Sequence, residues 1–363
     1  MQSPSRSAQA HMDDAKSYSA ALYCSVCPLK EACGGLHCKA SPLSCLEYCC
    51  GLPDGCTTVC PRNPAFIDQI AEVGGFDLGA LAIAAGPPVM LNQKIVPMIY
   101  HGSKRTRPFL ANTVALRLSD VINFRHGICR FHSREQLCAE FKLDPRCRIV
   151  LSGVDHDPVI ERLWSLGVER FELFRTIALL GIACATTPNF SMVLDVPRSD
   201  NLHSMQRIAI IYSEMSSAGL PTALHVNGRT DYDFERWARF LQDHKSINAL
   251  SYEFITGSGL DYRRNKHGDW LNGLIADSGR DVHLIIRGNP ESLTVLDSKY
   301  TLTYIETTSF VKAINRQESV RSGNAKLIWN TSENADAFDV SGALEHTVHE
   351  VSESLSCRYP VLG

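Results

Sequence analysis

The sequence contains no apolar run near the roughly 20 residues that a membrane-spanning helix needs, so we expect no membrane span. Its first residues, MQSPSRSAQAHMDD, lack the apolar stretch of a secretory signal, which predicts a cytoplasmic protein. The sequence also has no large excess of positive or negative charge. The 36 Lys and Arg residues against 39 Asp and Glu give a net charge of -3, which excludes a surface that is basic throughout. A local basic groove for nucleic acid stays compatible with this balance.

Length and composition indicate a globular chain. Its 363 residues are 44% hydrophobic and 21% charged, which excludes a disordered or fibrous protein. The chain is long enough to bury a sizeable core and exceeds one minimal domain. Changes in composition and apolar pattern along the chain predict four parts: a disordered N-terminus (1–20), a cysteine-rich metal module (21–64), a barrel (65–330) and a C-terminal tail (331–363).

Cysteine is concentrated in one short segment near the N-terminus. Without a secretory signal, close spacing of thiols favours metal ligation over disulfides, because neighbouring thiolates can share one metal. Zinc and a 4Fe-4S iron–sulfur cluster suit these thiolates equally, and both stay open. We expect the other cysteines to be ordinary buried thiols. The predicted metal ligands are Cys24, Cys27, Cys33, Cys38, Cys45, Cys49, Cys50, Cys56 and Cys60.

Apolar strands and amphipathic helices alternate along the rest of the chain. Short connections between such elements predict parallel βαβ units. About eight strands in roughly 260 residues fit a (β/α)8 barrel of the TIM type. The sequence lacks both a GxGxxG turn after a first strand and a phosphate-binding P-loop, which disfavours doubly wound sheets. The strands are expected at 96–100, 114–118, 148–154, 191–195, 222–226, 249–255, 282–286 and 301–305, with one more near 326–329.

Polar residues follow several of these strands. In barrel enzymes the chemistry lies at the C-terminal strand ends, and carboxylates there suit acid–base or nucleophilic work. Asp195 and Glu306 stand out because each directly ends an apolar strand. Histidines near strand ends are too few to favour a barrel metal-hydrolase. The candidates at strand ends are Asp120, Asp155, Asp195, Glu253, Arg287 and Glu306.

Four segments, taken in order, resemble the barrel of tRNA-guanine transglycosylases and their relatives that insert deazapurines into DNA. They are FSMVLDVPRSDN, ALHVNGR, ITGSG and VHLIIRGNPESLTVLDSKYTLTYIETTSFVKAINR, within residues 189–316. The resemblance implies that Asp195 recognises the base and that Glu306 is the nucleophile. It further implies a substrate-binding set of Asn227, Gly228, Arg229, Gly257, Gly259, Lys312 and Arg316, of which the last two lie near nucleic acid.

The implied reaction is base exchange in DNA or tRNA, in which a carboxylate displaces guanine and a purine or deazapurine base replaces it. Such an enzyme is a pentosyltransferase. The sequence departs from the family in having a glutamate where the nucleophile is an aspartate, and in placing its cysteines before the barrel. Asp120 and Asp155 are the candidates for the family's aspartate-glycine-glycine motif. The loop HGSKRTRP supplies Lys104, Arg105 and Arg107 as expected phosphate contacts.

Two other functions remain open from the sequence. One is a nucleic-acid-associated accessory protein, in which a metal-stapled barrel recognises partners without turnover. The other is an iron–sulfur barrel enzyme. The sequence lacks the CxxxCxxC loop after a first strand that radical barrels carry, which is evidence against the iron–sulfur enzyme.

Overall fold

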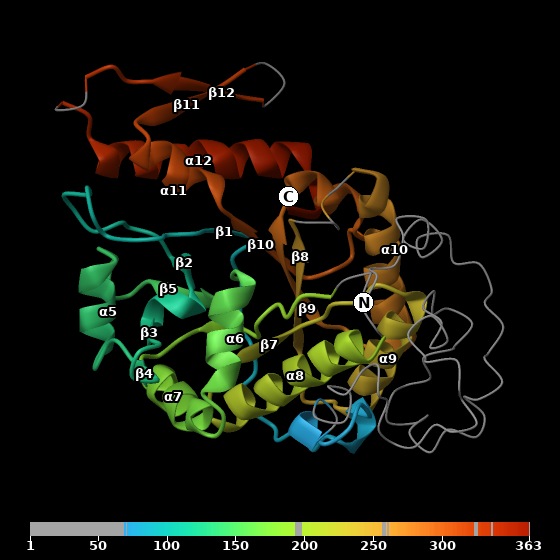
Figure 1. The fold of residues 1–363 in the computed structure, drawn as a ribbon. Coiled ribbons are helices and arrows are strands. Elements are labelled where there is room, and N and C mark those ends of the chain that lie inside the picture. The colour runs from blue at the N-terminus through green and yellow to red at the C-terminus, as the bar shows by residue number, and fades with distance from the viewer. Residues whose placement is uncertain are drawn as a thin grey trace, which may run out of the picture.

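In the computed structural model, strands and helices alternate along the chain (Figure 1). The described residues are 69, 71–192, 198–255, 259, 261–322, 326–334 and 337–362. The strands are β1 (Ile95–Pro97), β2 (Thr113–Arg117), β3 (Ile122–Asn123), β4 (Ile128–Cys129), β5 (Arg148–Ser152), β6 (Cys184–Thr186), β7 (Thr222–His225), β8 (Ala249–Phe254), β9 (His283–Gly288), β10 (Leu302–Glu306), β11 (Gln317–Arg321) and β12 (Leu327–Thr331). The helices are η2 (Leu78–Ala80), η3 (Leu118–Val121), α5 (Arg134–Glu140), α6 (Asp157–Ser165), α7 (Glu169–Ala178), α8 (Arg198–Ser217), α9 (Asp231–Asp243), α10 (Asp261–Ser278), η4 (Pro290–Val295), α11 (Thr308–Ile314), α12 (Val340–Arg358) and η5 (Pro360–Leu362).

Eight parallel strands form one sheet that curls into a barrel. Their order is β1-β10-β9-β8-β7-β6-β5-β2. Met98, directly after β1, pairs in parallel with Ala115 of β2, and the N–H of Ile99 donates to the carbonyl oxygen of Ala115 at 2.8 Å. This contact joins the two edges of the sheet. The predicted α/β barrel, with helices between its strands, is therefore confirmed as a nearly closed barrel.

One small or branched residue from each strand fills the barrel interior. Side chains alternate along a strand, so the neighbouring positions pack outward into the larger core between the sheet and the helices. Leu224, Leu250 and Leu284 are such outward residues. The interior set is Val96, Ala115, Val150, Cys184, Ala223, Ala249, Ile285 and Ile305.

The N-terminal end of the barrel is closed by residues that precede β1. Val89 and Leu91 belong to the interior cluster. The side chain of Asn248 binds both backbone groups of Val89, accepting from its N–H at 3.1 Å and donating to its carbonyl oxygen at 2.9 Å. The opposite, C-terminal end is where the polar strand-end residues gather.

Local sequence signals explain where α9 and η4 begin. Thr230 and Asp233 form a complete capping box at the start of α9, because each side chain accepts from the backbone N–H of the other. Asn289 caps η4, and Pro290 occupies its first turn. No helix in the described parts of the chain is long and apolar enough to cross a membrane.

The fourth barrel strand differs from the prediction. The strand expected at 191–195 is wrong at Ser191 and Met192, which belong to no strand, whereas β6 spans Cys184–Thr186. Cys184 and Ala185 are small and fully buried, which suits a short strand in the narrow barrel. Phe190 and Met192, which follow β6, are buried in the outer core instead.

Within the predicted C-terminal tail, 331–363, the structure describes helix α12. Its Ala343, Leu344, Val351 and Leu355 are buried in the main core. In Figure 1 this helix and the antiparallel hairpin β11–β12 lie together on one side of the molecule, beyond β1. The strand predicted at 326–329 corresponds to β12 and is outside the barrel sheet.

Candidate functional site

Polar side chains from several strands meet at the C-terminal end of the barrel. We call this set the mouth: Arg117, Asp120, Asp155, Asn189, Glu253 and Arg287. Arg287 extends across it from β9 toward β5. From β9 its Nη1 donates to the carbonyl oxygen of Val154 at 3.1 Å and lies 3.4 Å from Oγ of Ser152 on β5. Its Nε is buried and has no hydrogen-bond partner within the described residues, which leaves a donor inside the mouth.

Glu253 lies beside Arg287, because the two residues are register partners on β8 and β9. Its carboxylate is half-buried and accepts a hydrogen bond from Nδ2 of Asn189 at 2.7 Å. Burial raises the pKa of the Glu253 carboxyl, while the charge of Arg287 and the hydrogen bond from Asn189 act in the opposite direction. Burial dominates, so Glu253 holds a proton at higher pH than an ordinary glutamate.

Asn189 connects this carboxyl to a second one. Its Oδ1 accepts from the backbone N–H of Asp155 at 3.1 Å, while its Nδ2 binds Glu253. Asp155 itself accepts from the hydroxyl of Ser119 and, at 2.8 Å, from the N–H of His156. One amide therefore holds two carboxyl-bearing segments in a fixed relation.

Asp120 is engaged by an arginine. Arg117, at the end of β2, donates from Nε and Nη2 to the two carboxylate oxygens at 2.9 and 2.7 Å. Its guanidinium also lies 5.6 Å from the ring centroid of Tyr100. Of the four predicted catalytic residues, the structure brings Asp120 and Asp155 to the mouth.

Glu306 has a different environment. Ile305 fills the barrel interior and Tyr304 packs outward, so alternation turns Glu306 toward the helices. Its Oε2 accepts from the N–H groups of Thr308 and Ser309 at 2.8 and 3.0 Å, which caps α11. Burial raises the pKa of this carboxyl, and the capping hydrogen bonds oppose that rise. The residue in the predicted nucleophile position is a buried helix cap.

Asn227, Gly228 and Arg229 follow β7 and hold the neighbouring loop. Nδ2 of Asn227 donates to the carbonyl oxygen of Phe190 at 3.1 Å, and Nε of Arg229 donates to that of Met192 at 2.9 Å. Gly228 packs closely on α9, since a Cβ there would lie 2.7 Å from that of Asp233. These predicted substrate residues have structural partners.

The other described members of the predicted substrate-binding set have contacts outside the mouth. The carbonyl oxygen of Gly259 accepts from Asn289 at 3.4 Å. Lys312, on α11, lies 4.8 Å from the ring centroid of Trp329. Arg316 occupies the turn between α11 and β11 with a positive φ of 57°. Asp195 and Gly257 lie outside the described residues.

The predicted phosphate loop contains one residue that does not fit that role. Arg105 is 2% exposed and donates to the carbonyl oxygens of His101, Phe141 and Lys142. A guanidinium so enclosed cannot contact phosphate. Arg107 is half-exposed and pairs with Asp339 and Glu345 at 3.0 and 3.2 Å, while Lys104 is exposed.

The structure does not describe the residues that are predicted to bind a metal. All nine predicted cysteine ligands, Cys24 to Cys60, lie outside the described residues. Within the described ranges no group of three or more His, Cys, Asp or Glu residues is arranged to hold a metal ion. Four of the five other cysteines are buried thiols, as expected, whereas Cys357 is exposed.

Sequence reasoning noticed Glu253 and Arg287 as strand-end residues but left them out of the site, and it missed Asn189. A charged residue inside the apolar run ALSYEF was the available signal for Glu253. Asn189 gave none, because its role depends on two partners 34 and 64 residues away.

The mouth can perform acid–base chemistry. It combines a carboxyl group of raised pKa, a second carboxylate in a polar setting and a buried arginine donor. Comparison with known proteins adds no relative: no family model matches the chain, and no curated protein matches its sequence significantly.

Proposed function

We propose that the barrel catalyses base exchange on a nucleic acid, with the carboxyl groups of Glu253 and Asp155 as its working pair. The observation that carries this proposal is that Asn189 holds both carboxyl-bearing segments at the mouth. Enzymes that cleave glycosidic bonds commonly use two carboxyl groups, whose surroundings make one the acid and the other the nucleophile or base.

In this proposal Glu253 is the general acid, because burial raises the pKa of its carboxyl above that of an ordinary glutamate. Asp155, which accepts hydrogen bonds from Ser119 and His156, is the nucleophile. Its oxygen forms a bond to the anomeric carbon while the bond from that carbon to the base nitrogen breaks. The departing purine takes the proton of Glu253. The incoming purine or deazapurine base then gives its own ring N–H proton to the Glu253 carboxylate, while its nitrogen bonds to the anomeric carbon and displaces Asp155, so both carboxyl groups return to their starting state.

This assignment moves the nucleophile away from Glu306. The resemblance to transglycosylases supports the reaction class, but Oε2 of Glu306 accepts from the backbone N–H groups at the start of α11. Its Oε1 is buried without a hydrogen-bond partner among the described residues. Lys104 remains a candidate contact for the phosphates of DNA or tRNA.

The cysteine-rich segment is proposed to bind zinc or a 4Fe-4S cluster. Its support is the spacing of the nine thiols between Cys24 and Cys60. A cytoplasmic location, where thiols stay reduced, belongs to the same proposal.

The test is incorporation of labelled guanine or a deazaguanine into tRNA and, separately, into duplex DNA by the metal-replete protein. We expect exchange with one polymer, loss of exchange in Glu253→Gln and Asp155→Asn, and retention in Glu306→Gln. Retention in Glu253→Gln together with loss in Glu306→Gln would overturn the assignment of the residues. Absence of exchange with both polymers would overturn the enzyme itself.

The commitment of Glu306 to a helix cap specifically favours one second candidate, an accessory protein that binds nucleic acid without turnover. Fluorescence anisotropy with labelled tRNA and duplex DNA tests it. Binding of either polymer without any exchange supports the accessory function, and the absence of both binding and exchange rejects both candidates.

A further inference from the structure

The loop after β6 carries Asn189 into the mouth, and its neighbours are tied down on both sides. Before Asn189, the hydroxyl of Thr187 accepts from the N–H of His225 at 2.8 Å. After it, the hydroxyl of Ser191 donates to Asp157 at 2.6 Å, and the carbonyl oxygen of Ser191 accepts from Ser204 at 3.2 Å. The position of Asn189 is thus set by contacts outside the mouth.

Phe190 is the main anchor of this loop. It is fully buried, and its ring meets that of Trp164 edge-on with centroids 5.9 Å apart. The guanidinium of Arg207 lies 4.2 Å from the centroid of Phe190, a distance at which a cation is attracted to an aromatic face. Arg207 is itself 9% exposed, so solvent does little to weaken this contact.

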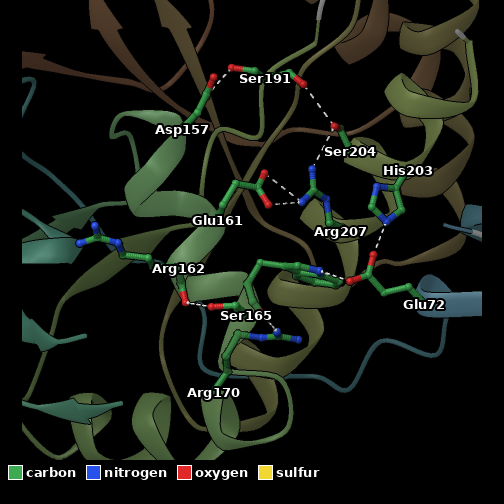
Figure 2. Close-up of polar contacts among 11 residues, drawn as sticks. Glu72, Asp157, Glu161, Arg162, Ser165, Arg170, Ser191, His203, Ser204 and Arg207 are labelled. Atoms are coloured by element: carbon green, nitrogen blue, oxygen red, sulfur yellow. Dashed lines mark hydrogen bonds and ion pairs between the residues drawn. The ribbon is translucent and has the colours of Figure 1, made fainter. Parts of the chain in front are cut away.

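Arg207 is held in turn by one side chain of α6 and one of its own helix, α8. Figure 2 shows its guanidinium on α8 directed at Glu161 of α6, with Nη1 at 3.0 and 2.8 Å from the two carboxylate oxygens. Its Nη2 lies 3.5 Å from Oγ of Ser204, whose hydroxyl binds Ser191. The guanidinium therefore contacts the loop directly through Phe190 and indirectly through Ser204.

We infer that Arg207 is a positioning residue: by fixing Phe190 it holds the carboxamide of Asn189 against Glu253 in the mouth. This inference rests on the proposed function, in which Glu253 is the working acid. It assigns a role in the reaction to a residue of helix α8, outside the mouth.

The test follows the carboxyl of Glu253 directly. The protein is labelled with carbon-13 at glutamate carboxyl groups, the Glu253 signal is assigned with Glu253→Gln, and its titration is followed by NMR. Asn189→Ala serves as the reference for complete loss of the contact. Because the hydrogen bond from Asn189 lowers the pKa of Glu253, we expect Arg207→Met to raise that pKa in the direction of the reference.

Methionine suits this variant because it fills much of the space of the arginine stem, and Glu161 is half-exposed and can be hydrated when it loses its partner. Ser191→Ala, at an exposed position, loosens the same loop and guards against misfolding of the first variant. We expect the same direction of shift from it. Arg207→Lys, which keeps the cation, should restore part of the wild-type titration.

Arg170→Met is the matched control. Arg170 is another buried arginine, 5% exposed, whose guanidinium lies 4.3 Å from the Trp164 centroid and which pairs with Glu214 at 2.9 Å. Its loss should lower stability but shift the titration of Glu253 less than Arg207→Met does, because Arg170 reaches Phe190 only through Trp164. An unchanged Glu253 titration in folded Arg207→Met and Ser191→Ala overturns the inference, as does an equal shift in Arg170→Met.

The NMR readout needs no turnover, so the two proposals fail separately. If wild-type protein shows no base exchange but Arg207→Met shifts Glu253, the proposed function fails and the positioning stands. If exchange occurs, Arg207→Met should lower kcat as Asn189→Ala does and leave the KM for the polymer unchanged. A raised KM with unchanged kcat would contradict the positioning.

Discussion

Arg287 donates a hydrogen bond to the carbonyl oxygen of Val154 at 3.1 Å, across a barrel in which three strands separate β9 from β5. A bond between non-neighbouring strands of a barrel has to cross its lumen. The same arginine lies beside Glu253 in the register of β8 and β9. It therefore both braces the mouth and sets the charge around its most buried carboxyl.

Replacing Arg287 by methionine should raise the pKa of Glu253, because its positive charge stabilises the ionised carboxylate. If Glu253 is the acid, the basic limb of the pH–rate profile moves to higher pH. Carboxyl NMR measures the shift without turnover. Arg287→Lys, which keeps the charge, is the control and should move the titration less. A lower pKa in Arg287→Met would contradict the arrangement.

Glu306→Ala should lower the free energy of unfolding by about 1–2 kcal/mol, because α11 loses the acceptor for two N–H groups. Glu306→Gln keeps an acceptor oxygen and should cost less. Urea unfolding of both variants measures the difference. Equal stability of wild type and Glu306→Ala would show that the cap contributes nothing.

Arg105→Ala should destabilise the fold by about 3 kcal/mol, because buried carbonyl oxygens of His101, Phe141 and Lys142 lose their donor. Burial lowers the pKa of Arg105 to about 10, still far above neutrality, so the interior holds a charged guanidinium. The exposed Lys104→Ala should stay within about 0.5 kcal/mol of wild type. Thermal or urea unfolding distinguishes the two, and similar losses would contradict the interior role of Arg105.

Stability should fall as the pH drops below 6.5. Burial lowers the pKa of His225 to about 3, so the folded state keeps it neutral while the unfolded chain protonates it near 6.5. His267, buried beside Tyr252, behaves alike, with a pKa of about 3. Between these values each histidine contributes a slope of about 1.4 kcal/mol per pH unit. Urea unfolding at several pH values should show a shallower dependence for His225→Phe, and an unchanged slope would reject the assignment.

Metal removal should leave the barrel folded, because the nine predicted cysteine ligands, Cys24 to Cys60, all precede the barrel strands in the sequence. Elemental analysis and visible absorption of purified protein should show zinc or iron. Alanine in place of the nine cysteines from Cys24 to Cys60 should abolish that metal while the far-ultraviolet circular dichroism of the barrel is kept. Metal retained by this variant would place the site elsewhere.

Those parts of the fold that depend on neighbouring residues, such as helix starts, could be predicted from the sequence. The capping box of Thr230 and Asp233 and the Asn289-Pro290 start of η4 lie within a few residues of the helices they begin. The alternation of strands and helices then limits the architecture to few topologies, because a helix that connects two neighbouring strands returns the chain to the edge where the first strand began and leaves the two strands parallel. The fourth strand was misplaced because FSMVLD is more apolar than CAT, although it is Cys184 of β6 that contributes the side chain to the barrel interior.

The sequence by itself determined that polar residues follow the barrel strands, including Asp120, Asp155 and Glu253. Tertiary structure decided which of them work together. Strand register alone turns Glu306 outward to cap α11, and only the closed sheet brings Asn189 to Glu253 and Arg287 to Val154, over separations of 64 and 133 residues. A one-residue change in register reverses the face of a side chain, so the composition of the mouth depends on the closure of the barrel and cannot follow from local sequence.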